Sequence, residues 1–249
     1  MASLNVFGSA PPKQAWLRRF FAEPHEFLNG HDLSRDQRYF FYRFLRDANL
    51  LTKTEPTSFA YLVKIFGWDK DASLGLMLVN LTAVNIQIRW FIENLPLEKI
   101  ISRTEVEAKL LSTGATKNSV RKILQSFGRF SETAFGSVLK FGKVTYAGRR
   151  LETLTRTKAK VTDGRVILYS LYKLAEAVGV RQFTLSELLE ATASPAKIFG
   201  LGVEELEQFL NGLSANYPEF IDATFTHDLE KITLKPDVGA EDILKLFEV

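Results

Sequence analysis

Apolar residues recur at helical spacing through the first hundred residues of the chain. The segments PPKQAWLRRFFA, SRDQRYFFYRFLRDANLL and TSFAYLVKIFG each place large apolar side chains three or four positions apart, which is typical of one buried helix face. Ser34 and Thr57 are suited to begin two of these helices as N-caps, and Gly67 to end the last. These patterns predict a helical N-terminal region over residues 1–96 with an aromatic core.

The most apolar stretch of the chain is ASLGLMLVNLTAVNIQIRWFI, residues 72–92. It is long enough to span a bilayer, but polar residues interrupt it at Asn80, Asn85, Gln87 and Arg89. We therefore expect one helix buried in the protein core and no contact with a membrane. Because the N-terminus resembles no secretory signal, we expect a cytoplasmic protein.

Two shorter helices joined by a tight turn follow Pro96. Ser102 and Glu105 have the spacing of a capping box, Gly114 can take a left-handed conformation, and Thr116 can cap the second helix. Apolar residues of the second helix fall on one face, at Val120, Ile123, Leu124 and Phe127. The other face carries amide and cationic side chains, which can read base edges or hold phosphates.

A basic hairpin comes next, in LKFGKVTYAGRRLETLTRTKAKV, with Gly148 in its turn. Helix, turn, helix and hairpin together predict a winged-helix-like module over residues 97–162, whose second helix enters a major groove while the wing reaches phosphates. The candidate DNA-binding residues are Lys117, Asn118, Arg121, Lys122, Gln125, Arg129, Lys143, Arg149, Arg150, Arg156, Lys158 and Lys160.

The last third of the chain, residues 163–249, repeats this order of elements. Three helical segments precede FIDATFTHDLEKITLK, a predicted hairpin with His227 at its turn. In the third helix we expect a buried face of Val203, Leu206, Leu210 and Leu213 and an outward face of Glu204, Glu205, Glu207 and Gln208. Carboxylates are repelled by DNA, so this second winged-helix-like module is expected to bind protein or only its own neighbours. The predicted fold class is mainly α, with a helical N-terminal region followed by two winged-helix-like modules with small β-hairpins.

The charge distribution supports different partners for the two modules. Residues 100–166 carry 14 Lys and Arg against 5 Asp and Glu, a net charge of +9, whereas residues 167–249 carry 6 against 14, a net charge of −8. Lysine and arginine near phosphates gain affinity by counterion release. The basic segment therefore indicates double-stranded DNA as its partner.

Few residues of the sequence suit catalysis. The chain has no cysteine, and its histidines, His25, His31 and His227, are too scattered to form a spaced metal-ligand motif. No phosphate-binding or nucleophile-elbow motif occurs, and the acidic pairs in HDLSRD and WDKD are more simply helix caps. We expect no metal and no cofactor, and we assign no catalytic residue.

Several phrases carry a resemblance to a known family: LMLVNL, FSETAFGSVL, LTRTKA, VILYSLYKLAEA, QFTLSELLE and IFGLGVEELEQFLNGLSANYPEFIDATFTHDLEKITL. Over residues 72–247 the chain resembles the accessory region of phosphoadenosine phosphosulfate (PAPS) reductase-like proteins from bacterial gene clusters for DNA phosphorothioation and phage defence. The resemblance implies a role in DNA modification or defence. The chain lacks the SGGKDS-type nucleotide loop of the reductase domain, so any sulfur transfer would occur on a partner.

Three functions follow as expectations. The first is a DNA-binding accessory protein of a DNA-modification or phage-defence system. The second is an interaction subunit for a PAPS reductase-like or other defence-system protein. The third is a DNA nicking endonuclease, which the resemblance allows because related small proteins of such clusters include nicking components.

Overall fold

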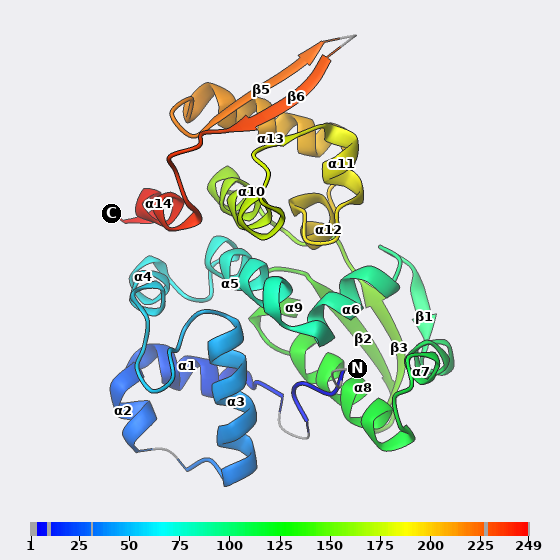
Figure 1. The fold of residues 1–249 in the computed structure, drawn as a ribbon. Coiled ribbons are helices and arrows are strands. Elements are labelled where there is room, and N and C mark those ends of the chain that lie inside the picture. Colours follow the sequence, from blue (N-terminus) through cyan, green and yellow to red (C-terminus); the bar gives the residue numbers. More distant parts are fainter. Residues whose placement is uncertain (1–3, 9–10, 31, 227–228, 249) are drawn as a thin grey trace.

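The computed structural model describes residues 4–8, 11–30, 32–226 and 229–248. The chain is mainly helical and contains two small antiparallel sheets of three strands each. Figure 1 shows the helical N-terminal region and the basic module side by side, with the C-terminal module above them. His31 and the predicted hairpin turn at His227 lie outside the described residues.

The N-terminal region contains α1 (Gln14–Ala22), α2 (Pro24–Asn29), α3 (Arg35–Asp47) and α4 (Ser58–Phe66). The predicted caps are confirmed: the Ser34 hydroxyl accepts from the backbone N–H of Gln37 within a capping box, and Thr57 caps α4. Gly67 ends α4 at a φ of 105°. Sequence patterning missed α2, which Pro24 begins.

The prediction of one helix over residues 72–92 is wrong, because the chain bends by 98° between α5 (Asp71–Val84) and α6 (Ile86–Asn94). Asn85 makes the break: its Oδ1 accepts from the N–H groups of Gln87 and Ile88 and so caps α6. Arg89 donates to carbonyls at the end of α5. Within the described residues, no unbroken helix has the length and apolarity to cross a bilayer, although the bent pair together meets that test.

The central module is built from two strands that form a hairpin, a third strand that pairs with it, and two main helices. Its elements are β1 (Ile100–Ser102), α7 (Arg103–Ser112), α8 (Lys117–Ser131), the short α9 (Ala134–Ser137), β2 (Gly142–Ala147) and β3 (Arg150–Arg156). The sheet order is β1-β3-β2, and both pairings are antiparallel. The predicted hairpin is confirmed, with Gly148 in the turn at a φ of 63°.

The C-terminal module shares with the central module a short strand, two main helices and a β-hairpin in that order, but it has further helices before, between and after them. It contains α10 (Gly164–Val178), β4 (Gln182–Phe183), α11 (Leu185–Glu190), α12 (Pro195–Phe199), α13 (Val203–Asn216), β5 (Ile221–Thr226), β6 (Leu229–Leu234), α14 (Ala240–Leu244) and the 3-10 turn η1 (Lys245–Phe247). Its sheet order, β4-β6-β5, repeats that of the central module. On α13 the predicted buried face holds for Leu206, Leu210 and Leu213, but Val203 is 50% exposed because it is the first residue of the helix.

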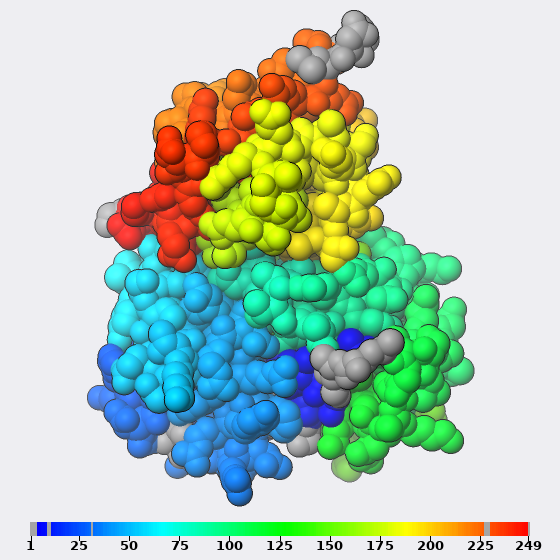
Figure 2. Space-filling model, viewed as in Figure 1, coloured from blue at the N-terminus to red at the C-terminus, as the bar shows by residue number. Residues whose placement is uncertain are grey.

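The buried apolar side chains of all three regions form one continuous core. At its centre α5 packs against both α3 and α10, and the Asn80 side chain accepts a 2.7 Å hydrogen bond from the Tyr169 hydroxyl. Phe127 of α8 stacks on Trp90 of α6, at 6.2 Å between ring centroids. Figure 2 shows the resulting close packing of the C-terminal module, yellow to red, on the other two regions. The orientation of α8 is therefore set by the core.

Candidate nucleic-acid interface

One side of α8 is buried and the other carries most of the predicted DNA-binding side chains. The predicted apolar residues, Val120, Ile123, Leu124 and Phe127, are all buried. On the outward side Lys117, Asn118, Arg121, Gln125 and Arg129 are exposed, and Lys122 is half-buried.

Local contacts fix where α8 starts. The Thr116 hydroxyl accepts from the N–H of Ser119, as the sequence predicts for an N-cap. The preceding helix α7 is held by the predicted capping box between Ser102 and Glu105. Gly114 joins the two helices at a φ of 83°, a left-handed conformation that glycine adopts without strain. The cationic face is therefore presented by a capped, well-defined helix.

The tip of the β2–β3 hairpin lies along one flank of α8. The Tyr146 hydroxyl donates a 2.9 Å hydrogen bond to Glu132, the residue that follows α8. A Cβ placed on Gly128 would lie 2.5 Å from that hydroxyl and 3.6 Å from Leu151. Burial and the neighbouring Glu132 carboxylate raise the pKa of Tyr146 to about 12. Arg149, in the hairpin turn, and Arg150 are exposed. Arg150 alternates with Leu151, which faces Gly128, so the Arg150 side chain points to the face of β3 away from α8.

Most of these cations have no carboxylate partner. Within the described part of the chain no ion pair is formed by Lys117, Arg121, Lys122, Arg149 or Arg150. Arg121 donates instead to the Asn118 side chain at 3.1 Å, and Arg129 pairs with Glu132 at 3.0 Å. Such an exposed pair contributes little stability, so Arg129 can exchange its partner for a phosphate or base at small cost.

Three other candidate residues lie away from this face. Lys143 is exposed, but it lies on the side of β2 opposite to Val144, which packs against the core. Lys158 forms an ion pair with Glu205 of α13. Lys158 and Lys160 line a cavity of about 490 Å³ between the central and C-terminal modules. The structure does not bring these lysines to the α8 face.

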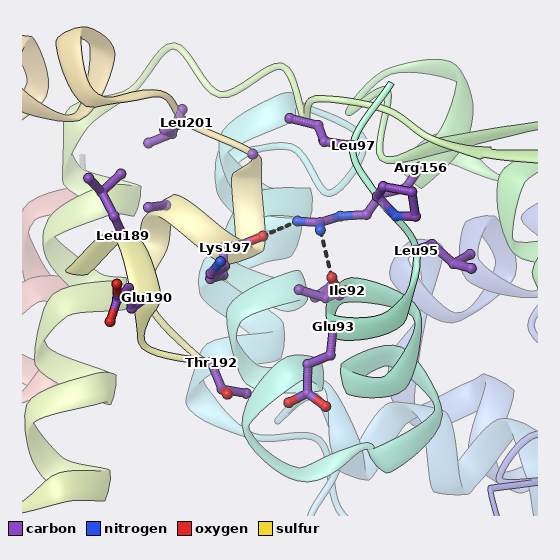
Figure 3. A pocket seen from close by; sticks show the side chains of 13 residues that line it. Ile92, Glu93, Leu95, Leu97, Arg156, Leu189, Glu190, Thr192, Lys197 and Leu201 are labelled. Atoms are coloured by element: carbon purple, nitrogen blue, oxygen red, sulfur yellow. Dashed lines mark hydrogen bonds between the residues drawn. The ribbon is translucent and has the colours of Figure 1, made fainter. Parts of the chain in front are cut away.

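The prediction that Arg156 binds DNA is wrong, because its side chain is only 6% exposed. The guanidinium donates to the carbonyl oxygens of Ile92, at 2.6 Å, and of Lys197, as Figure 3 shows. Burial lowers the pKa of Arg156 to about 10, so the side chain stays charged at neutral pH. It lines a cavity of about 610 Å³ between α6, α11 and α12. Its position there makes it a structural link between the modules.

The structure adds residues that sequence patterning did not connect with the candidate interface. Gln125 and Arg129 line a cavity of about 290 Å³ together with residues of the N-terminal region, among them Lys13, Ser34, Asp36 and Gln37. The sequence does not predict that Lys13 and Arg129 line the same cavity, because distant segments of the chain pack together there.

The described residues contain no group of three or more histidine, aspartate or glutamate side chains close enough to hold a metal ion. The acidic residues Asp36 and Asp71 instead lie in the first turns of α3 and α5. A negative side chain at such a position interacts favourably with the helix dipole.

Comparisons with known proteins identify the fold. No family model matches the sequence, and no curated protein matches it. Two solved structures share the fold of the whole chain: "SspB crystal structure", with a TM-score of 0.71 and 13% identity, and "Magnesium ion-bound SspB crystal structure", with a TM-score of 0.70 and 14% identity. Each alignment covers 100% of this chain and 87% of the other.

Proposed function

We propose that this chain is a DNA-binding accessory protein in which α8 enters the major groove as a recognition helix and the β2–β3 hairpin acts as a wing. The assignment of both modules as winged helices is supported by their element order and by the strand orders β1-β3-β2 and β4-β6-β5. In this class of module the second helix reads the groove and the adjoining hairpin touches the backbone.

The observation that carries this proposal is the outward face of α8. Asn118 and Gln125 offer amides that can pair with adenine, while Arg121 and Lys122 can donate to guanine or to phosphate. These cations have no acidic partner among the described residues, so contact with DNA breaks no ion pair. In this proposal the exposed Arg149, in the turn of the wing, contacts the phosphate backbone.

We assign the protein to a DNA-modification or phage-defence pathway because of the PAPS reductase-associated phrases in residues 72–247. The shared fold with proteins named SspB is compatible with this assignment. In this proposal the chain supplies DNA binding, and a partner carries out any sulfur transfer.

Charge reversal on α8 tests the DNA-binding role. Arg121→Glu with Lys122→Glu should weaken binding to a random-sequence duplex. It should also reduce the slope of log K against log salt by about two, because each lost phosphate contact lowers that slope by nearly one. Fluorescence anisotropy over a range of salt concentrations measures both quantities.

The matched control is Lys53→Glu with Lys231→Glu, which changes the net charge equally at exposed positions outside the candidate interface. Equal affinity and equal slope in the two double variants would reject the proposal. The same samples with supercoiled plasmid and magnesium, examined for strand breaks, test the nicking alternative.

The C-terminal module favours a second function as an interaction subunit. On α13, Glu204 is exposed and Glu207 is half-buried, so the helix that corresponds to α8 presents negative charge. A basic protein surface suits this face better than DNA does. If it binds a PAPS reductase-like partner, Glu204→Lys with Glu207→Lys should abolish co-purification of that partner and leave duplex affinity unchanged.

A further inference from the structure

The two flanks of α8 are bordered by different parts of the molecule. Gly128 and Phe130 lie on opposite sides of Arg129, each about 100° around the helix. The wing contacts the Gly128 side through Tyr146. On the other side Phe130 stacks on Phe7 at 6.4 Å between ring centroids. The N-terminal region therefore borders the flank that the wing does not reach.

A second contact fixes the start of α1 beside α8. The side-chain oxygen of Gln14 accepts a 2.9 Å hydrogen bond from the N–H of Ala134, in the short helix that follows α8. Lys13, the residue before Gln14, is exposed, and its ammonium lies 5.0 Å from the centre of the Trp16 ring. Among the described residues Lys13 forms no ion pair. Its charge is thus held in place but not neutralised.

Lys13 and the outward face of α8 share one cavity of about 290 Å³. Gln125 and Arg129 form its α8 wall, and Lys13, Ser34, Asp36 and Gln37 contribute from the N-terminal region. Pro11 and Trp16 complete the lining. Two of the polar side chains are cations and one, Asp36, is a carboxylate, so the recess next to the surface proposed to enter the groove carries a net positive charge.

A helix in the major groove lies between two phosphodiester strands, and phosphate contacts on both strands fix its register. The wing contacts one flank of α8 only. We propose that the cavity on the other flank holds a phosphate of the second strand, with Lys13 as its cationic contact. This inference rests on the proposed function and deepens it, because it assigns the N-terminal region to the DNA interface.

Asp36 gives the proposal a second, opposite expectation. Its carboxylate lines the same cavity and forms no ion pair within the described residues, so it repels a phosphate there. Removing that charge should strengthen DNA binding, whereas reversing the charge of Lys13 should weaken it. If either residue had only a structural role, the two substitutions would not change the DNA affinity in opposite directions.

The test compares Lys13→Glu and Asp36→Asn with Lys53→Glu and Asp69→Asn, which make the same changes at exposed sites outside the cavity. At about 0.1 M salt Lys13→Glu should lower the association constant for a random duplex by about five- to tenfold and reduce the salt slope by about one. Asp36→Asn should raise the association constant by about two- to threefold.

Lys13→Glu binding like Lys53→Glu, or Asp36→Asn failing to exceed Asp69→Asn, overturns this inference. If reversal of Arg121 and Lys122 still weakens binding in that case, the proposed function stands and only the contribution of the N-terminal region is rejected. If none of these variants differs from its control, both are rejected.

Discussion

The guanidinium of Arg156 bonds two carbonyl groups that belong to helices far apart in the sequence. The carbonyl of Ile92, in the last turn of α6, would normally accept from the residue four positions on, but that residue is Pro96, which has no N–H. The carbonyl of Lys197, near the end of α12, likewise accepts from Arg156. A cation at two helix C-termini also interacts favourably with both helix dipoles.

Replacing Arg156 by methionine should therefore destabilise the protein. The variant leaves the buried carbonyl of Ile92 and the part-buried carbonyl of Lys197 without their donor, which costs roughly 2–4 kcal/mol of unfolding free energy. Urea denaturation measures this cost, and Arg150→Met, the same change at an exposed position of the β2–β3 hairpin, should cost less than about 0.5 kcal/mol. Equal stability of the two variants would contradict a structural role for Arg156.

The position of Arg156 could have been read from strand alternation. Arg156 follows Leu154 by two residues, so both side chains point to the same face of β3, and Leu154 is buried. The net charge of the basic segment contains no information on which strand face each cation occupies. By contrast, the partner of Lys158 could not be predicted, because Glu205 lies 47 positions away in the sequence.

At the scale of elements, α8 followed from local signals, since a capping threonine and one apolar face determine both its start and its orientation. Local signals did not predict the bend between α5 and α6 at Asn85. Asn85 is held by Asp47, through a 2.8 Å hydrogen bond from its side-chain amide, and that contact exists only in the folded chain. The short helices α2, α9 and α12 have too few residues for a periodic pattern to reveal them.

The packing of the β2–β3 hairpin on α8 predicts coupling between Gly128 and Tyr146. Alanine at position 128 favours the helix by about 1 kcal/mol, but its Cβ would lie 2.5 Å from the Tyr146 hydroxyl. In a Tyr146→Phe background the nearest ring carbon lies at an ordinary 3.6 Å. Gly128→Ala should therefore stabilise the Tyr146→Phe protein and stabilise the unsubstituted protein less or not at all. Identical effects on urea unfolding in both backgrounds would show that the hairpin does not lie where the structure places it.

For the molecule as a whole, the sequence predicted the opposite charges of the two modules but not which cations share a surface. Folding packs the β2–β3 hairpin on α8 through the Tyr146 contact, turns Lys143 and Arg150 to the reverse side of the sheet, and adds Lys13 from the N-terminal region. The candidate interface is thus smaller than the basic segment and includes a residue outside it.

Lysine acetylation of the protein with and without a saturating random duplex tests the central claim most directly. Lys117 and Lys122, on the outward side of α8, should be protected by DNA, whereas Lys143, on the reverse side of the central sheet, and Lys231, in β6, should react equally in both samples. Unchanged reactivity of Lys117 and Lys122 in the presence of DNA, or protection of Lys231 in their place, would contradict the assignment of α8 as the DNA-binding helix.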